Sequence, residues 1–334
     1  MNKIKVSFVI AVLNGISTIK ECLASILSQD YPSGNYEIIV IDGGSNDGTL
    51  SAVSVLQKEN AQIKLMHNPF TLSEGKGNGK DQGVSSARGE YIVFLDHDNI
   101  LLHNDWLAEM MRPMGEDNQI MASQSFLMYL PGDPPFLKYV NALGVEDPFA
   151  VDYSLVSQAV LRPEQFESVN GYYVHTLNPK HVLFGGANGC LFRKEVFGII
   201  GGYTRDVDVF KDMADCGMKV AIPQKSRLYH KTSNSLSSFM IKKGKYYCRF
   251  IRNDYSWKKY NWAGNDLRSK IRFWLRVASN LSLLVPFITA IKQFSKKRKL
   301  FWLLHPLYTF FITLEYGIIT LFFIRNYIGY VSKR

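Results

Sequence analysis

The N-terminal third of the chain alternates between short apolar runs and amphipathic segments. Val6 to Leu13 is apolar and β-branched almost throughout, which is typical of a strand covered on both faces. The turn Asn14-Gly15 ends this strand, and apolar residues then recur at helical spacing until Tyr31-Pro32 stops the helix. The same cycle predicts further strands at 36–41, 63–66 and 91–95, and helices at 49–58 and 104–114. This alternation predicts an α/β fold with a Rossmann-like, mainly parallel central sheet flanked by helices.

The pattern is less regular in the middle of the chain. Four prolines fall between Tyr129 and Phe149, and we expect an irregular loop there. Regular patterning resumes at Val182 to Phe192, and Val209 to Cys216 predicts a helix that Gly217 ends. Because ligands of doubly wound sheets bind at the carboxyl ends of the strands, polar residues just after each strand are the first candidates for a site.

The last hundred residues differ from the rest in charge and in hydropathy. Residues 241–334 hold 19 Lys and Arg against three acidic residues, a balance of +16, whereas the rest of the chain is slightly acidic and the whole carries +10. Residues 235–252 predict a basic helix, and two apolar stretches follow at 273–291 and 300–324. Each stretch has about the length of a bilayer span, roughly 20 residues, yet each contains polar or helix-breaking groups.

These features predict association with a membrane. Nucleic acid binding explains the charge but not the apolar runs, so no nucleic acid partner is expected. If both stretches spanned a bilayer, the basic loop 292–299 would lie on the far side, against the positive-inside rule. We therefore expect a re-entrant or interfacial hairpin at the anionic lipids of the cytoplasmic face of the cell membrane. A two-span anchor and a helical cap on the chain's own domain stay open. The four cysteines lack CxxC spacing, which favours a reducing compartment.

Two carboxylates lie two residues apart at the end of an expected strand, in Phe94-Leu95-Asp96-His97-Asp98. A divalent cation held by carboxylates can act as a Lewis acid on a departing diphosphate. This DXD pattern therefore predicts a site for Mg²⁺ or Mn²⁺ at Asp96 and Asp98. An ordinary acidic turn is the alternative.

Two further polar segments follow strands. Asp42 ends the second strand, where its carboxylate can accept a hydrogen bond from the imide N–H of uracil. Residues 74–83 are rich in glycine, and Lys76 and Lys80 within them can face a diphosphate. A capped turn and a flexible surface loop, respectively, are the alternatives.

Asp42, Asp96 and the glycine-rich stretch, in this order, resemble the nucleotide-binding half of glycosyltransferase family 2, whose members have the GT-A fold. The resemblance begins at Val6, with Ala11-Val12-Leu13-Asn14 at the family's first strand end, and extends to about His230, roughly two thirds of the chain. It implies a nucleotide-sugar donor, most simply a UDP-sugar. The residues that it assigns to the nucleotide are Ala11, Val12, Asn14, Asp42, Lys80 and Asp96, and those that it assigns to the metal are Asp96, Asp98 and His230.

The resemblance also implies a catalytic base. Gly201-Gly202-Tyr203 resembles the family's Gly-Gly-aromatic turn, and Asp206 falls where the family's catalytic carboxylate lies. In the family this group takes the proton of the acceptor hydroxyl, and one direct displacement inverts the anomeric centre. Arg205 stands where many members have Glu, which leaves Asp208 as the fallback. The Gln-x-x-Arg-Trp sequence of processive members is missing downstream, which favours transfer of a single sugar.

The sequence therefore predicts a GT-A catalytic domain at residues 1–232 and a membrane-associated segment at 233–334. The expected reaction is metal-dependent, inverting sugar transfer to a polyprenyl-linked glycan or lipid acceptor, as in surface polysaccharide synthesis. A sugar nucleotidyltransferase and a non-catalytic nucleotide-binding scaffold at the membrane are the alternatives.

Overall fold

The computed structural model describes residues 5–68, 76–144, 167–179, 186–233, 235–254 and 266–331. The chain forms two compact units. The first contains Met1–Tyr129 and Leu143–Lys231, and the second contains Leu130–Ala142 and Thr232–Arg334.

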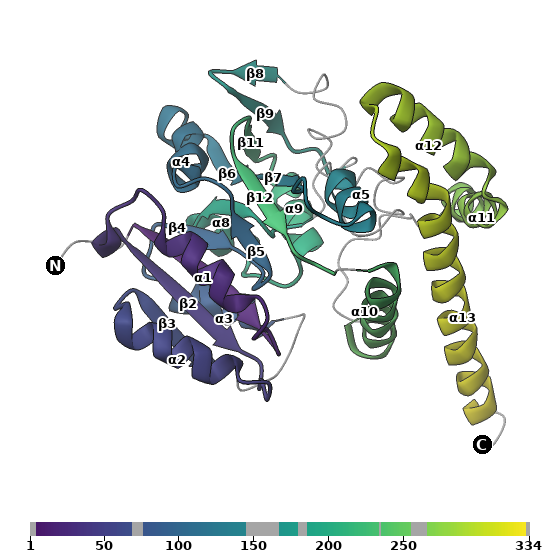
Figure 1. Cartoon of the computed structure of the whole chain (residues 1–334), viewed down its shortest axis with the longest axis horizontal. Coiled ribbons are helices and arrows are strands. Elements are labelled where there is room, and N and C mark those ends of the chain that lie inside the picture. Colours follow the sequence, from purple (N-terminus) through teal and green to yellow (C-terminus); the bar gives the residue numbers. More distant parts are fainter. Residues whose placement is uncertain are drawn as a thin grey trace. The chain divides into compact units, whose positions relative to one another are not determined.

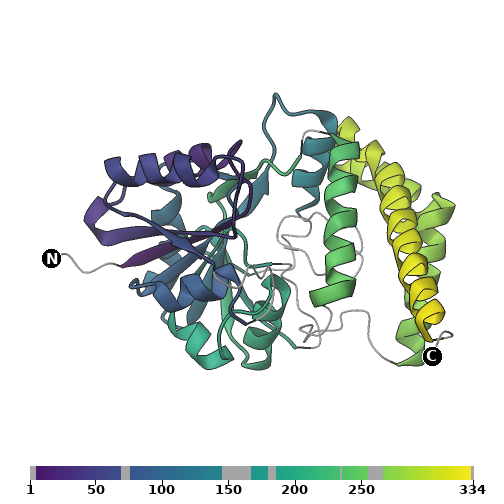
Figure 2. The ribbon, with the colours of Figure 1, turned by 90° about the horizontal axis from the view of Figure 1, so that it is seen from below.

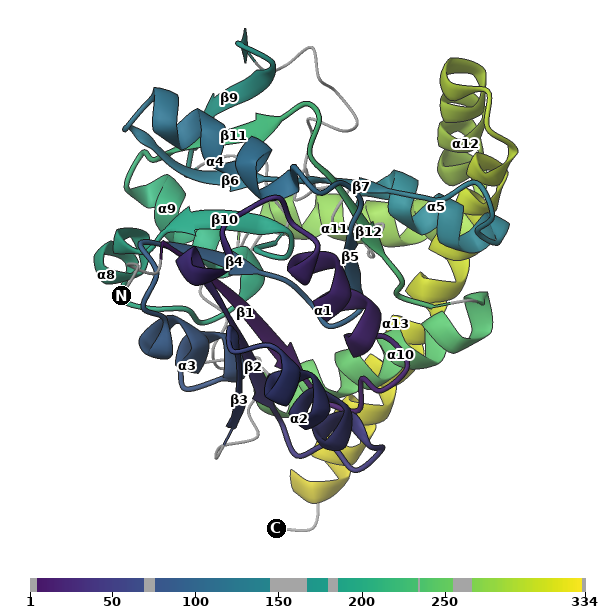
Figure 3. The same ribbon diagram turned by 60° about the vertical axis from the view of Figure 1, so that its left-hand side comes forward.

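A large central sheet forms the first unit (Figure 3). Among the described residues it has nine strands in the order β3-β2-β1-β4-β10-β6-β11-β9-β8. Their bounds are β1 (Val6–Val12), β2 (Tyr36–Asp42), β3 (Ile63–His67), β4 (Tyr91–Phe94), β6 (Ile120–Gln124), β8 (Glu167–Val169), β9 (Tyr172–Thr176), β10 (Cys190–Arg193) and β11 (Lys219–Pro223). Strands β3, β2, β1 and β4 are mutually parallel, whereas β10 runs antiparallel between β4 and β6. The α/β, GT-A-type prediction is confirmed.

Helices cover both faces of this sheet. The apolar side chains of α1 (Ile19–Leu27), α2 (Thr49–Glu59) and α4 (Trp106–Glu116) join the core on one face (Figure 1). On the other face, α3 (Gly79–Ser86) packs on β1 and β2, and α8 (Glu195–Ile200) and α9 (Asp206–Asp215) pack near β10. The strands are buried on both faces, as their unbroken apolar runs predict.

A small second sheet lies next to the carboxyl end of β4. It has the order β5-β12-β7, with bounds β5 (Asn99–Leu101), β7 (Phe126–Met128) and β12 (Arg227–His230). β12 is antiparallel to β5 and pairs His230 with Asn99. These short strands were not predicted from the sequence, because three or four residues are too few to show a period.

The prediction of an irregular loop in the proline-containing region is wrong for residues 135–143. They form a helix, α5 (Pro135–Leu143), since proline at the first helical position loses no hydrogen bond. Within the glycine-rich stretch, α3 starts at Gly79, so the alternative of a flexible surface loop does not hold for this part. Residues 74–75, 145–149 and 182–185, on which parts of these expectations rest, lie outside the described residues.

Helices form the second unit, including α5, α10 (Leu236–Arg249), α11 (Leu267–Ser282), α12 (Leu284–Lys297) and α13 (His305–Val331) (Figure 2). An aromatic cluster holds α5, α10 and α13 together, with Phe136, Phe239 and Tyr308 packed edge to face or tilted. Tyr139 of α5 also bonds to His305.

One continuous helical stretch in the described residues, Leu300–Ile324, is apolar and long enough to cross a membrane. Helices α11 and α12 pass the same test only as a pair, with a bend of 74° at their junction. Leu283 at this break has a left-handed backbone, with φ of 64°. A bent pair of this kind matches either a broken span or a re-entrant loop.

Candidate functional site

The acidic pair after β4 meets a histidine from β12. Asp98 Oδ1 lies 3.0 Å from His230 Nε2, and both side chains are about 90% buried. Ligand atoms of Asp96, Asp98 and His230 all lie within 4.8 Å of one another. Two carboxylate oxygens and one imidazole nitrogen suit Mn²⁺ and are compatible with Mg²⁺. The residues present therefore fit a divalent cation.

Asparagine side chains fix the backbone of the acidic turn. Asn99 Oδ1 and Asn188 Oδ1 each accept a hydrogen bond from the Asp96 N–H at 3.0 Å. Asn188 comes from the segment just before β10, so the antiparallel strand contributes to the site. Behind the turn, burial and then the charges of Asp98 and Asp96 raise the pKa of the Cys22 thiol. Cys22 therefore stays protonated and adds no thiolate to the cation site.

Lys80 enters the same site from the start of α3. Asn78 caps this helix by accepting hydrogen bonds from the backbone N–H groups of Lys80 and Asp81. The helix lies close against β1, because a Cβ added at Gly83 would stand 2.2 Å from Val9 Cγ1. The glycines thus let α3 bring Lys80 close to the sheet edge.

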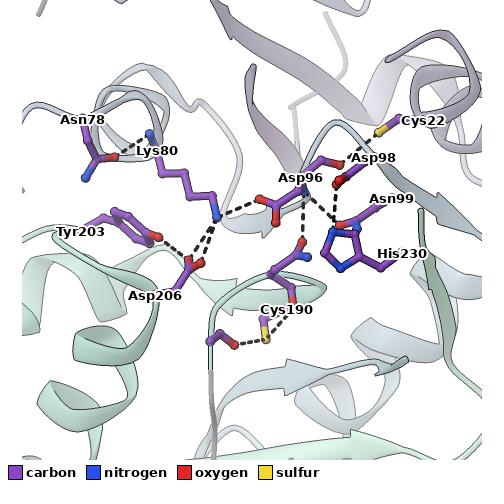
Figure 4. Close-up of polar contacts among 12 residues, drawn as sticks. Cys22, Asn78, Lys80, Asp96, Asp98, Asn99, Cys190, Tyr203, Asp206 and His230 are labelled. Atoms are coloured by element: carbon purple, nitrogen blue, oxygen red, sulfur yellow. Dashed lines mark hydrogen bonds and ion pairs between the residues drawn. The ribbon is translucent and has the colours of Figure 1, made fainter. Parts of the chain in front are cut away.

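Lys80 pairs with two carboxylates at once (Figure 4). Its Nζ lies 3.1 Å from Asp96 Oδ1 and 3.0 Å from Asp206 Oδ1. Burial alone lowers the pKa of Lys80, but the charges of Asp206 and Asp96 outweigh burial and raise it above its ordinary value. Lys80 is therefore an ammonium ion at physiological pH.

Asp206 is the first residue of α9 and faces Lys80 and Tyr203. The Tyr203 hydroxyl donates a hydrogen bond to Asp206 Oδ1. Burial alone raises the pKa of Asp206, but the Lys80 charge and the hydrogen bonds from Tyr203 and Lys80 outweigh burial and hold it below its ordinary value. Asp206 is thus ionised, and its side chain is 37% exposed.

Side chains from α3 also support the turn that leads to Asp206. Asp81 Oδ1 accepts a hydrogen bond from the Tyr203 N–H at 3.0 Å, and the Asn78 amide donates to the Thr204 carbonyl at 3.0 Å. Asp208, the fallback base, is 1% exposed and points away from solvent. Of the two carboxylates, Asp206 is therefore the one that solvent can reach.

The ends of β1 and β2 form a separate part of the sheet edge. Asp42 is fully buried, and its Oδ2 accepts hydrogen bonds from the N–H groups of Gly44 and Ser45. Its Oδ1 has no hydrogen-bond partner among the described residues. Asn14, with φ of 55°, accepts a bond from the Asn46 N–H and so ties the two loops together.

Ala11, Val12 and Arg193 lie in strands of the central sheet. Ala11 and Val12 lie at the carboxyl end of β1, where the Val12 carbonyl accepts a bond from the Gly43 N–H. Arg193 donates hydrogen bonds to the carbonyls of Ile120 and Met114, which is a structural role.

Sequence reasoning missed the contacts of Tyr203, Asn99 and Asn188 with the site. The aromatic position after Gly-Gly was visible in the sequence, but its hydroxyl bond to Asp206 was not. No local pattern marks Asn188, since its partner at Asp96 is brought close only by the antiparallel pairing of β10 with β4.

Comparison with known proteins assigns the family. Residues 7–197, more than half of the chain, match the sequence model described as Glycosyl transferase family 2. A poly(ribitol-phosphate) β-glucosyltransferase of Bacillus spizizenii is 34% identical over 97 residues, which are 29% of this chain and 15% of that protein. A GalNAc(5)-diNAcBac-PP-undecaprenol β-1,3-glucosyltransferase of Campylobacter jejuni is 36% identical over 112 residues, 34% of this chain and 35% of that protein.

The chain spans less than half the length of these curated relatives. Among solved structures, a mannosyltransferase from Pyrobaculum calidifontis in complex with GDP-Man and Mn²⁺ is similar with a TM-score of 0.56. The match covers 95% of this chain and 88% of that chain at 15% identity, so the two share a fold. On the matched sequence, which includes the acidic turn and the start of α3, the chain belongs to glycosyltransferase family 2.

Proposed function

We propose that the protein is a metal-dependent, inverting glycosyltransferase that passes one sugar from a nucleotide sugar to a lipid-linked acceptor. One observation carries this proposal: a fitting cation site and an ionised, partly exposed carboxylate lie on either side of Lys80. These are the two functions that the reaction needs, one for the leaving diphosphate and one for the acceptor proton.

Asp96, Asp98 and His230 would hold Mg²⁺ or Mn²⁺ on the leaving-group side. The cation, when bound, neutralises charge on the departing nucleoside diphosphate. Asn99 and Asn188 keep the acidic turn in place through the Asp96 N–H. Lys80 supplies an ammonium group beside Asp96, where it can bind a diphosphate oxygen.

Asp206 would act as the general base. Its exposed carboxylate can accept the proton of an acceptor hydroxyl, while Tyr203 and the Asp81-supported turn fix its orientation. Attack assisted by one base on the face opposite the leaving group inverts the anomeric centre.

Asp42 would select the nucleobase. Its Oδ1 lacks a hydrogen-bond partner among the described residues, so a donor such as the uracil imide N–H would satisfy it after a small opening of the turn. Ala11, Val12 and Asn14 line the neighbouring strand end and its turn. This supports a UDP-sugar as the donor.

The C-terminal segment, residues 233–334, would place the catalytic domain, residues 1–232, at the cytoplasmic face of a membrane. Helix α11 exposes Leu267, Trp274 and Leu275 at helical spacing, each more than 60% exposed. Helix α12 exposes Leu284 and Ile288 in the same way. Exposed basic side chains flank these faces: Arg268, Lys270, Arg272, Lys292 and Lys296. Apolar faces bordered by cations suit an anionic bilayer surface.

The acceptor follows from this location. An enzyme held at a bilayer meets substrates whose carriers are lipids, such as polyprenyl-linked glycans. The name of the Campylobacter jejuni relative specifies an undecaprenol-linked glycan, which supports this class of acceptor.

Turnover of UDP-sugars tests the proposal. Purified protein in anionic vesicles with an undecaprenol-diphosphate-linked sugar should release UDP and lengthen the lipid-linked glycan, and EDTA should stop both. Asp206→Asn should lower turnover about 10²- to 10⁴-fold. Asp215→Asn, an exposed carboxylate on the same helix, is the matched control and should stay active. Turnover at the wild-type rate in the presence of EDTA, or by the Asp206→Asn variant, contradicts the proposed mechanism.

A further inference from the structure

In this structure Lys80 forms ion pairs with both functional carboxylates, Asp96 and Asp206. Its ammonium has three protons, and it contacts Asp96 Oδ1 at 3.1 Å and Asp206 at 3.0 and 3.4 Å. The Lys80 side chain is 11% exposed, whereas those of Asp96 and Asp206 are 35% and 37% exposed. The cation is therefore covered by its two partners, and any anion that enters must compete with them.

The base is not ready to act in this arrangement. Asp206 Oδ1 accepts hydrogen bonds from both Lys80 and Tyr203, and Oδ2 also lies within reach of Lys80. A carboxylate whose lone pairs point at an ammonium and a hydroxyl has little capacity left for an acceptor hydroxyl proton. The Lys80 ammonium must therefore leave Asp206 before this carboxylate can act as a base.

A bound donor can draw the Lys80 ammonium away from Asp206. Lys80 Nζ is 3.1 Å from Asp96, so if Asp96 held a cation, a diphosphate bound to that cation would come within reach of the ammonium. A diphosphate oxygen is a strong partner for an ammonium ion, and the cation takes over the charge of Asp96. Asn78 and the packing of Gly83 fix the backbone at Lys80. The four-carbon side chain of Lys80 has several rotatable bonds, so its ammonium can change partner while the backbone stays in place.

We propose that Lys80 is exchanged between Asp206 and the donor diphosphate, so that the base becomes available only when a donor is bound. Lys80 is thus a positioning residue that acts through Asp206. This inference rests on the proposed function, and it adds an order of events: donor first, base second. Tyr203 keeps Asp206 oriented when Lys80 leaves.

The exchange has a thermodynamic signature that needs no turnover. If Asp206 and the diphosphate compete for Lys80, the donor-free pairing lowers the apparent affinity for the nucleotide. Removing the charge of Asp206 then frees Lys80, and the nucleotide should bind more tightly. A loss of simple repulsion between Asp206 and the diphosphate would also tighten binding, but it would do so whether or not Lys80 is present.

A double-mutant cycle separates the two effects. The dissociation constants of UDP and of GDP, each with Mn²⁺, are measured by calorimetry for the wild type, Asp206→Asn, Lys80→Met and the double variant. We expect Asp206→Asn to bind the nucleotide about two- to fivefold more tightly than the wild type, in line with the strength of one partly exposed ion pair. In the Lys80→Met background the same substitution should change the affinity less than twofold.

Controls keep the result interpretable. Circular dichroism and melting temperature check the fold of each variant. Lys80→Arg keeps the charge, so in this background Asp206→Asn should again tighten nucleotide binding, as it does with Lys80. Unchanged or weaker binding in Asp206→Asn overturns the exchange, and so does a gain that persists with Lys80→Met. If neither nucleotide binds the wild type, donor binding fails and the inference fails with it. Wild-type binding without a gain in Asp206→Asn refutes the exchange alone and leaves the proposed function standing.

Discussion

Asp98 and His230 are joined by a 3.0 Å contact between a carboxylate oxygen and an imidazole nitrogen, although they belong to different segments of the chain. The contact depends on the antiparallel pairing of β5 with β12, which sets His230 opposite Asn99. A buried carboxylate and a buried histidine in this geometry form the inner part of the candidate cation site. The small second sheet therefore brings His230 beside the acidic turn, where it completes the candidate cation site.

Removing either partner should weaken cation binding. Asp98→Asn removes the carboxylate charge and His230→Gln removes the imidazole nitrogen, both with little change in side-chain volume, so we expect Mn²⁺ affinity to fall about 10-fold or more. Titration of Mn²⁺ followed by electron paramagnetic resonance measures this. Asp105→Asn, an exposed carboxylate nearby in the chain, is the control and should bind as the wild type does. Equal Mn²⁺ affinity in all three variants speaks against the site.

The hydroxyl of Tyr203 should set the acidic limit of activity. Asp206 must be deprotonated to act as a base, and the Tyr203 hydrogen bond helps to hold its pKa below the ordinary value. Tyr203→Phe removes that bond, so the pKa rises and the acidic limb of the kcat/KM profile should move to higher pH. We expect a shift of less than about one pH unit, since Lys80 remains in place. An acidic limb that does not move, or that moves to lower pH, contradicts Asp206 as the base.

The sequence carried the information for elements whose signal is local. The apolar runs of β1, β2 and β4 predicted buried strands within a residue or two, and their ends correctly located Asp42 and the Asp96 turn at the edge of the sheet. Strand ends in a parallel sheet gather at one edge, so these placements needed no long-range information.

Other features depend on packing between distant segments. Lys80 and Asp206 lie 126 residues apart, and their contact requires α3 to lie flush on β1 and the Gly201-Gly202 turn to meet it. The role of Asn188 requires β10 to insert antiparallel beside β4. The glycines of residues 74–83 left a flexible surface loop open as an alternative, whereas Gly83 is what the contact of α3 with β1 needs.

A buried glutamate in the sheet should contribute to stability above acidic pH. Glu37 of β2 is 1% exposed and accepts hydrogen bonds from Ser7, Lys64 and the Arg88 backbone. Burial alone raises the pKa of Glu37, but these hydrogen bonds outweigh burial and lower it from 4.5. A carboxyl group with a depressed folded-state pKa adds stability above its unfolded pKa and loses that contribution as the pH falls through the folded value.

Glu37→Gln keeps the shape but loses the charge, so we expect the unfolding free energy at pH 7 to drop by about 1 to 3 kcal/mol. The deficit should shrink as the pH falls through the lowered folded-state pKa of Glu37, where the wild-type carboxylate becomes protonated too. Thermal melts across this range measure both effects, with Glu59→Gln, an exposed residue at the end of α2, as control. A deficit of constant size at every pH argues against the ionic role.

The exposed apolar faces of α11 and α12 should bind anionic lipid. Leu275→Ser and Phe287→Ser each remove a large exposed apolar side chain, and we expect binding to vesicles of phosphatidylglycerol and phosphatidylcholine to weaken about tenfold per substitution. Val55→Ser, which removes an equally exposed apolar residue from α2, should have no effect. Binding should also fall as salt rises, because the flanking basic residues are screened. Sedimentation with vesicles tests both, and undiminished binding of the two variants excludes these faces as the contact.

Gly83 provides the sharpest test of how α3 delivers Lys80 to the site. A methyl group there would stand 2.2 Å from Val9 Cγ1, so in Gly83→Ala either α3 or β1 must move. We expect a loss of about 1 to 3 kcal/mol in unfolding free energy and a fall in nucleotide affinity, since Lys80 is displaced from Asp96. Gly115→Ala is the matched control: a Cβ at this position in α4 meets nothing within 4 Å, so helix propensity should make that variant as stable as the wild type or more so. Val9→Ala added to Gly83→Ala makes room for the methyl group and should restore nucleotide binding, because the contact removed is the one that displaced the helix. If Gly83→Ala melts and binds like Gly115→Ala, the close packing of α3 on β1 is not what positions Lys80.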